Sequence, residues 1–312
     1  MNVVFFGTPA FAVPTLDALL SSPHTVVGVV TQPDRPRGRG QKVTDAPVKA
    51  RAAASAIPVL QPASLKDASF LAALAALETD IGVVAAYGKI LTDAVLATPR
   101  LGLMNVHASL LPRYRGAAPI ARAIIAGERE TGVTIMRVVK ALDAGPMLAE
   151  ARRPIGPDET SEDVERELAR IGASLLVSTL DRMAAGDAVE TPQDDSRSTY
   201  APRLTKEEGL IDWSRSARDV HNLVRGLHPW PHGYTFLKGQ RLIVHRTSHV
   251  AGRGLGPPGA IVEASGDELL VATGDGGILL LSLQTEGKRP MSAREFLSGH
   301  HLGPGDRFTS VA

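Results

Sequence analysis

Short apolar runs alternate with stretches of helical composition through the first part of this chain. Residues 2–6, 25–31, 81–87 and 101–107 are rich in valine, isoleucine, leucine and phenylalanine, and alanine-rich or amphipathic stretches lie between them. Strands that alternate with helices along the sequence usually pair in parallel, because each helix crosses over one face of the sheet. The order of these runs predicts an α/β domain built on a doubly wound, mostly parallel, Rossmann-like sheet.

The composition changes after a long predicted helix over residues 160–185, which Thr160 or Ser161 can cap and Gly186 can end. The residues that follow are rich in proline, aspartate, serine and threonine and show no apolar period, which is typical of a linker. Short alternating apolar runs separated by glycines then favour a small β-barrel. We therefore expect a catalytic domain over residues 1–189, a linker over 190–204 and a barrel domain over 205–312.

The composition excludes several classes of protein. The 312 residues contain no cysteine, which excludes disulfides, thiolate nucleophiles and thiolate-bound zinc or iron–sulfur centres. No lysine or arginine precedes Arg35, and no apolar run reaches ~18 residues, so neither a secretory signal nor a membrane span is expected. The net charge of +1 is too small to indicate nucleic-acid binding by itself. We expect a cytoplasmic protein that is a monomer by default.

Three polar residues, Asn105, His107 and Asp143, form a candidate catalytic set. Asn105 and His107 are separated by one residue, so both side chains leave the same face if residues 101–107 form a strand. An amide can donate to a developing oxyanion, and an imidazole can carry a proton to a leaving nitrogen. A carboxylate near the imidazole orients it and favours its charged form, which is the role expected of Asp143. The set suits transfer of an acyl group.

Each of these residues also has an ordinary structural explanation. Asn105 could cap a turn, His107 could be a hydrogen-bonded core histidine, and Asp143 could begin the turn before Gly145. For each residue taken alone, the structural explanation is favoured over a catalytic role. Together, at the end of a predicted strand and beside a loop rich in proline and glycine, they favour a site.

The segment that carries Asn105 and His107 resembles the folate-dependent formyltransferases. Six further segments resemble the same family in the same order, so the resemblance runs nearly from end to end. The seven segments are residues 3–19, 31–42, 105–119, 131–136, 204–213, 228–242 and 286–299. One departure falls at Ala141, where the family has glycine two residues before the acidic residue; Asp143 and Gly145 are retained.

The resemblance implies that the barrel domain over residues 205–312 is OB-like and binds tRNA. It also implies an activity and a co-substrate. It implies direct transfer of the formyl group of 10-formyltetrahydrofolate to the α-amine of methionine on initiator tRNA, without ATP, metal or a covalent enzyme intermediate, for translation initiation. Tyr87 and Gly88 resemble part of the folate pocket wall, although an ordinary buried tyrosine is an equal alternative. The folate-binding segment itself is expected at Ser109, Leu110, Leu111 and Pro112.

A basic, glycine-rich and proline-rich loop over residues 33–51 resembles the one that enters the acceptor end of initiator tRNA in this family. Arginine on such a loop suits RNA phosphates, while a solvated loop without a partner is the alternative from composition alone. The expected contacts in the loop are Arg35, Arg37, Arg39 and Lys42, with Arg39 and Lys42 the most important. Weaker candidates in the second domain are Lys238, Arg241, Arg246, Lys288 and Arg289, beside His245 and Arg294.

Other functions receive less support. Only Gly7 of a dinucleotide-binding glycine loop is present, and the phosphate loop of ATP and GTP enzymes is absent, which argues against a nicotinamide-dependent reductase. Transfer to a small amine, hydrolysis of the formylfolate, and RNA binding by a catalytic relic remain as alternatives. No metal site is predicted, because the histidines at 221, 228, 232, 300 and 301 have no recognisable ligand spacing.

Overall fold

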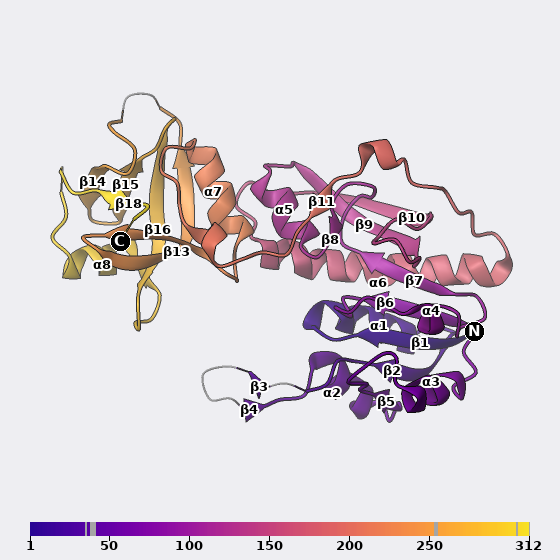
Figure 1. Cartoon of the computed structure of the whole chain (residues 1–312). Coiled ribbons are helices and arrows are strands. Elements are labelled where there is room, and N and C mark those ends of the chain that lie inside the picture. Colours follow the sequence, from indigo (N-terminus) through magenta and orange to yellow (C-terminus); the bar gives the residue numbers. More distant parts are fainter. Residues whose placement is uncertain (35, 38–41, 253–254, 304, 312) are drawn as a thin grey trace. The chain divides into compact units, whose positions relative to one another are not determined.

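The computed structural model describes residues 1–34, 36–37, 42–252, 255–303 and 305–311 (Figure 1). The chain divides into two compact units, each described here by itself. The first unit comprises residues 1–119, 131–153 and 165–201. The second unit comprises residues 120–130, 154–164 and 202–312.

A seven-stranded sheet in the order β10-β9-β7-β6-β1-β2-β5 organises the first unit (Figure 1). Its strands are β1 (Asn2–Gly7), β2 (Thr25–Val30), β5 (Val59–Leu60), β6 (Ile81–Ala85), β7 (Leu103–His107), β9 (Glu130–Arg137) and β10 (Met147–Pro154). Strand β1 pairs in parallel with β2 and β6, and β6 pairs in parallel with β7. The predicted doubly wound sheet is confirmed. The antiparallel pairing of β9 with β7 was not predicted.

Helices cover both faces of this sheet, because its central strands are apolar on both sides. All but the first residue of β1 are buried, as expected for a strand between two helical layers. The helices of the first part of the chain are α1 (Val13–Leu20), α2 (Pro47–Ala54), α3 (Ala68–Ala75), α4 (Asp93–Leu96) and α5 (Pro119–Ile125). On one face, Phe70 of α3 and Val95 of α4 belong to a single core cluster with Val4, Phe6 and Val30.

The long predicted helix is α6 (Ser161–Ala185), and the residues predicted to begin and end it do so. The Asp163 amide donates to the Thr160 hydroxyl at 3.3 Å, and Gly186 adopts φ +81° just beyond the last turn. A Cβ on Gly172 would lie 2.7 Å from Val106, so α6 packs closely against β7 at this glycine. Val106 therefore points toward α6, and its neighbours Asn105 and His107 point to the other face of the strand.

The second unit contains an antiparallel sheet in the order β14-β15-β16-β13-β12-β18, with β17 paired to β16. The strands are β12 (Gly233–Leu237), β13 (Gln240–Val250), β14 (Ile261–Ser265), β15 (Glu268–Ala272), β16 (Gly277–Thr285), β17 (Met291–Ser292) and β18 (Phe308–Thr309). An antiparallel bridge between Ala260 and Arg307 joins the two outer ends of the sheet. The sheet therefore curls onto itself, as the predicted barrel requires.

Two helices that were not predicted complete this unit, α7 (Ala217–Gly226) and α8 (Ala293–Gly299). Both contribute to one core, which includes Val220 of α7, Phe296 of α8 and Val244 of β13. Trp213 lies in the same core, where its indole N–H donates to the Thr235 hydroxyl at 2.9 Å. Among the helices of the described residues, none combines the length and the apolarity that a membrane crossing needs.

The segment predicted as a linker contains structure of its own. Strand β11 (Tyr200–Ala201) pairs in parallel with β8 (Arg115–Gly116), and a short 3-10 helix spans Asp195–Arg197. Residues up to 201 belong to the first unit. This segment therefore packs beside the loop that follows β7, where the candidate catalytic residues lie.

Candidate active site

Asn105 and His107 lie near the carboxyl end of β7, on the face opposite Val106. His107 is 5% exposed, and Asn105 is half-buried. Within the described part of the chain the Asn105 amide has no hydrogen-bonding partner, so both of its N–H groups can serve a ligand. The strand period thus brings an amide and an imidazole to one small surface, as the sequence predicted.

Both ring nitrogens of His107 face oxygen atoms. Its Nε2 lies 3.0 Å from the main-chain carbonyl oxygen of Tyr114, which can only accept, so Nε2 donates. Its Nδ1 lies 3.8 Å from Oδ2 of Asp143. That distance is too long for a hydrogen bond, but it allows an electrostatic contact with a protonated ring, between side chains that are 6% and 15% exposed. The structure thus brings Asp143 to His107 across 36 positions of the sequence.

The loop that carries Asp143 is held tightly. Asp143 has φ +46°, a left-handed conformation that is uncommon for a residue other than glycine, and its Oδ2 accepts from the Gly116 amide at 2.9 Å. A Cβ on Gly145 would lie 1.9 Å from the carbonyl oxygen of Arg137, so only glycine fits there. Ala141 does not have a positive φ, so the departure from the family glycine at that position causes no backbone strain.

Gln193, which the sequence analysis did not single out, fixes the same loop from the predicted linker. Its side-chain amide donates to the carbonyl oxygens of Asp143 and Gly145 at 2.9 and 2.8 Å. Its Oε1 accepts two hydrogen bonds from Arg115, at 3.0 and 2.8 Å, and Arg115 also pairs with Asp195 at 2.6 Å. No local pattern marks Gln193, because its partners are about 50 and 78 positions away.

Ser109 and Leu111, from the expected folate-binding segment, are clamped by hydrogen bonds on either side. The Ser109 hydroxyl donates to the carbonyl oxygen of Arg113 at 2.7 Å. The Thr134 hydroxyl on β9 donates to the Ser109 carbonyl at 2.8 Å and accepts from the Leu111 amide at 3.2 Å. Leu111 is buried, while Leu110 and Pro112 are half-buried. The segment is rigid and partly open, which suits a surface that contacts a ligand.

Tyr87 and Gly88 lie beyond β6. The Tyr87 ring is 1% exposed and packs edge-on against Phe6, and its hydroxyl has no partner among the described residues. Burial raises the pKa of this hydroxyl to about 12. The Tyr87 carbonyl oxygen accepts from the side chains of Gln32 and Thr8, at 2.8 and 3.3 Å. Gly88 has φ +81°, a conformation that glycine adopts without strain.

A cavity of about 300 Å³ lies in the first unit, at the carboxyl ends of β1, β2 and β6. Open α/β sheets usually bind ligands at this edge. The cavity is lined by Thr8, Pro9, Gln32, Pro33, Asp34, Thr44, Ala46 and Ala86. A hydrogen bond from Lys49, helped by one from Gln61, holds the pKa of Asp34 below its ordinary value, so this wall of the cavity carries a carboxylate.

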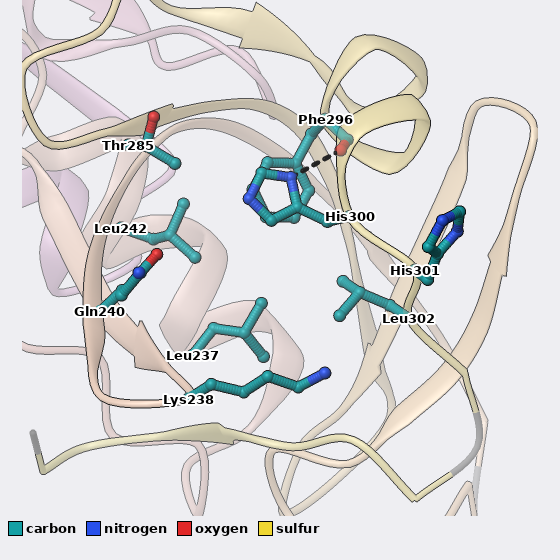
Figure 2. Close-up of a pocket in the computed structure, with 9 residues that line it drawn as sticks. All are labelled: Leu237, Lys238, Gln240, Leu242, Thr285, Phe296, His300, His301 and Leu302. Carbon is teal, nitrogen blue, oxygen red and sulfur yellow. Dashed lines mark hydrogen bonds between the residues drawn. The ribbon is translucent and has the colours of Figure 1, made fainter.

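A second cavity, of about 340 Å³, belongs to the second unit (Figure 2). Leu237, Leu242 and Leu302 give it apolar walls, and the His300 ring stacks on Phe296 with ring centres 4.1 Å apart. The Nδ1 of His300 donates to the main-chain carbonyl of Phe296 at 2.9 Å, which fixes the ring. None of the predicted catalytic residues lines this cavity.

Residues 35 and 38–41 of the predicted basic loop lie outside the described residues. Arg35 and Arg39 are not described, and of Arg37 and Lys42 only the backbone is. The backbone forms a small hairpin, in which Arg37 of β3 (Pro36–Arg37) pairs with Lys42 of β4 (Lys42–Val43). The RNA contacts expected for this loop stay predictions.

The predicted basic residues of the second unit differ in their surroundings. Lys238 pairs with Asp306 at 2.9 Å, and Arg289 with Glu295 at 3.3 Å. The Arg241 guanidinium lies 4.0 Å above the Tyr234 ring. Arg246 and Lys288 are exposed. Arg246 reaches the surface because the register between β13 and β16 shifts on both sides of it, where regular alternation would turn it inward with Val244.

A donor amide and an imidazole at the end of a strand in a Rossmann-like sheet, beside a partly buried carboxylate, are the groups that an acyl-transfer enzyme needs. Residues 1–180 match the formyl transferase family, and residues 203–301 match the C-terminal domain of formyl transferases. The chain belongs to the formyl transferase family.

Its relatives of high identity are methionyl-tRNA formyltransferases. The protein from Citrifermentans bemidjiense is 48% identical over 98% of this chain and 95% of its own length. Those from Moorella thermoacetica and Geobacter sulfurreducens are 45% and 47% identical, over 98% of this chain and 98% and 96% of their own lengths.

Solved structures share the fold at low identity. The N-formyltransferase from Helicobacter canadensis, solved with folinic acid and dTDP-3-aminofucose, has a TM-score of 0.69 at 18% identity and covers 91% of this chain and 98% of that chain. HypX from Aquifex aeolicus, solved with tetrahydrofolic acid, has a TM-score of 0.66 at 16% identity and covers 95% of this chain and 47% of that chain. Both likenesses support the predicted fold.

Proposed function

We propose that this chain transfers the formyl group of 10-formyltetrahydrofolate to the α-amine of methionine esterified to initiator tRNA. The observation that supports this most is the 45–48% identity to methionyl-tRNA formyltransferases over nearly the whole chain. The reaction supplies formylmethionyl-tRNA for translation initiation.

The acceptor amine attacks the formyl carbon, and a C–N bond forms while negative charge develops on the formyl oxygen. The Asn105 amide donates to that oxygen, together with an N–H of His107. The bond from the formyl carbon to the folate nitrogen then breaks. That nitrogen takes a proton from His107, and the amine gives up the proton that restores it. No covalent bond to the protein forms, and the step requires no ATP and no metal.

Asp143 acts on this reaction through His107. At 3.8 Å it stabilises positive charge on the ring without forming a direct hydrogen bond in this structure, and an ordered water or a small shift can complete the contact. The hydrogen bond of Nε2 to the Tyr114 carbonyl fixes the other side of the ring. An imidazolium held in this way keeps its Nδ1–H, which makes no direct hydrogen bond in this structure, for the formyl oxygen and the leaving nitrogen.

The folate lies against the segment of Ser109, Leu110, Leu111 and Pro112, with Tyr87 and Gly88 in the nearby wall. Related structures contain folinic acid or tetrahydrofolic acid, which supports a folate co-substrate in this fold. The partly exposed Leu110 and Pro112 offer apolar contact, and the hydrogen bonds of Thr134 hold the segment in place before a ligand binds.

The tRNA contacts are assigned to the basic loop and to the second unit. Arg35, Arg37, Arg39 and Lys42 bind the acceptor end, and the cations at 238, 241, 246, 288 and 289 bind phosphates. Catalysis belongs to residues 1–189, residues 190–204 link the domains and support the Asp143 loop through Gln193, and residues 205–312 bind tRNA. The protein works as a monomer in the cytoplasm.

The acceptor and the co-substrate can be tested separately. Folinic acid should raise the melting temperature of the chain, whereas NADH should not. Labelled formyl groups should move to methionyl initiator tRNA and not to glycinamide ribonucleotide or to an amino-sugar nucleotide. Transfer to a small amine would contradict the proposed acceptor, and stabilisation by NADH would contradict the proposed co-substrate.

A further inference from the structure

Three histidines of the second unit come together although His245 is 13 positions from His232 in the sequence. His228 and His232 flank the turn after α7, and His245 lies on β13. Each offers one ring nitrogen, and these three nitrogens all lie within 4.8 Å of one another. The ring centres of His228 and His232 are 5.3 Å apart, and those of His232 and His245 are 4.5 Å apart.

The nitrogens that face outward from this group have polar neighbours. The Nε2 of His245 lies 2.8 Å from Oε1 of Gln284, which can accept its proton. The Nε2 of His228 lies 3.5 Å from a carboxylate oxygen of Glu162. Histidines that bind metals usually give their second N–H to a carboxylate or carbonyl oxygen, which fixes the ring and leaves the other nitrogen for the ion.

Two nitrogens of the group are buried without any partner. The Nδ1 atoms of His228 and His232 are inaccessible and have no hydrogen bond among the described residues. A buried nitrogen without a partner costs free energy, and a bound cation would remove that cost.

The backbone departs from regular strand or turn geometry at two of the three histidines. His232 has φ +71°, a conformation that is rare for a residue with a side chain. His245 falls at the register shift of β13, between Val244, which pairs with Leu283, and Arg246, which pairs with Ser282. Bulges and left-handed residues redirect side chains and concentrate near functional sites.

We propose that His228, His232 and His245 bind one divalent first-row transition metal ion, with zinc the best match to three imidazoles. Imidazole suits zinc, copper and nickel, and zinc bound by three histidines keeps a fourth position for water or a carboxylate. Glu162, which is exposed beside His228, can reach that position or hold the His228 ring. Because Zn–N bonds measure about 2.0–2.1 Å, the three nitrogens must draw closer together around the ion.

The ion would have a structural role. It would join the turn after α7 to β13, and α7 and β13 also meet in the core of the second unit. None of Asn105, His107 and Asp143 takes part, so the proposal does not depend on the proposed function.

A titration with Co²⁺ tests this site directly. The complete chain, freed of any histidine tag and treated with a chelator, should bind one Co²⁺ with visible absorption of a four- or five-coordinate ion, and Zn²⁺ should displace it. The ion should also raise the melting temperature. His232→Ala and His245→Ala should each weaken Co²⁺ binding roughly 100-fold or more. Even the loss of a residue that only hydrogen-bonds to a metal ligand lowers metal affinity about 10–100-fold. His301→Ala, which changes an exposed histidine of the same unit, should bind as the unchanged chain does.

His228→Asn and His245→Asn provide gentler variants, and the melting temperature of each in chelator shows whether it folds. Equal binding by the unchanged chain and these folded variants would overturn the proposal. So would the absence of any visible Co²⁺ spectrum, or a spectrum that disappears only with His301→Ala.

Discussion

At the scale of single residues, the strand period places Asn105 and His107, and main-chain atoms complete the site. The separation of two positions was sufficient to predict that both side chains share a face. The approach of Asp143 was expected from the resemblance, since nothing local connects residues 107 and 143. The carbonyl oxygen of Tyr114 could not be predicted, because every residue carries the same main-chain acceptor.

His107→Ala should lower kcat by roughly 100-fold or more, the usual contribution of a general acid–base group, and leave the Kd for folinic acid nearly unchanged. Single-turnover transfer gives the rate, and equilibrium binding gives the Kd. His301→Ala serves as the control. Turnover close to that of the unchanged enzyme would remove His107 from the mechanism.

Tyr87→Phe tests whether the hydroxyl of Tyr87 contacts the folate or only the ring contributes to the pocket wall. Its hydroxyl is buried without a partner, so its removal should leave the free energy of unfolding unchanged or raise it by up to about 1 kcal/mol. The Kd for folinic acid should change by less than about twofold, because a hydrogen bond to the ligand would be worth more than that. Urea unfolding and ligand titration measure the two quantities. A clear loss of affinity would mean that the hydroxyl reaches the folate.

At the scale of elements, continuous apolar runs were the reliable signal. They located β1, β2, β6 and β7, and the alternating runs located β13 to β16. The helices α7 and α8 were missed because α7 mixes buried polar residues such as His221 and Arg225 into its face, and α8 has only seven residues. The short strand β11 was missed because two residues carry no period.

Gln193→Ala tests the support that the predicted linker gives to the Asp143 loop. The side chain bonds the carbonyl oxygens of Asp143 and Gly145, so its loss should release the loop and lower kcat about 10-fold with little change in the KM for folate. Gln240→Ala changes an exposed glutamine and should leave kcat unchanged. Steady-state kinetics separate kcat from KM. A rise in KM alone would indicate a binding role instead.

Glu208→Gln tests the ion pair between Arg122 of α5 and Glu208, which lies near the start of the segment 202–312. Arg122 donates to both carboxylate oxygens, and this holds the pKa of Glu208 below its ordinary value. The variant should lose about 1–2 kcal/mol of unfolding free energy at neutral pH. Because the folded pKa is lowered, this stabilisation is present above the ordinary pKa of glutamate and disappears as the pH falls through the folded value.

Urea unfolding at about pH 7 and about pH 3 measures the change, with Glu286→Gln as an exposed control. At the lower pH, Glu208→Gln and the unchanged chain should have nearly the same free energy of unfolding. If the difference in unfolding free energy between the variant and the unchanged chain is the same at both pH values, the charge of Glu208 does not cause it.

At the scale of the whole molecule, the order of elements was enough to predict two domains of different class. The number of units, the parallel sheet and the curled antiparallel sheet all follow from apolar periods. The contribution of residues 120–130 and 154–164 to the second unit could not be predicted, since it depends on contacts between distant segments. The histidine cluster could not be predicted for the same reason: His245 comes beside His228 and His232 only once β13 pairs with β12, the strand that follows the turn after α7.

The net charge of +1 is too small to draw tRNA to the whole surface, so binding must depend on local cations. Replacement of Arg39 or Lys42 by alanine should raise the KM for tRNA, and the effect should shrink as salt rises, because the lost contact is ionic. Lys66→Ala, which removes an exposed lysine elsewhere, should not change KM. Kinetics at several salt concentrations provide the comparison. An unchanged KM for tRNA would leave the loop without a role.

The most direct test of the central claim follows a labelled formyl group from 10-formyltetrahydrofolate in the presence of methionyl initiator tRNA, methionyl elongator tRNA, or water alone. We expect the label on the methionine of initiator tRNA, far faster than on elongator tRNA, and almost none in formate. Formate without transfer would indicate a hydrolase, and no reaction of the folate would contradict the account.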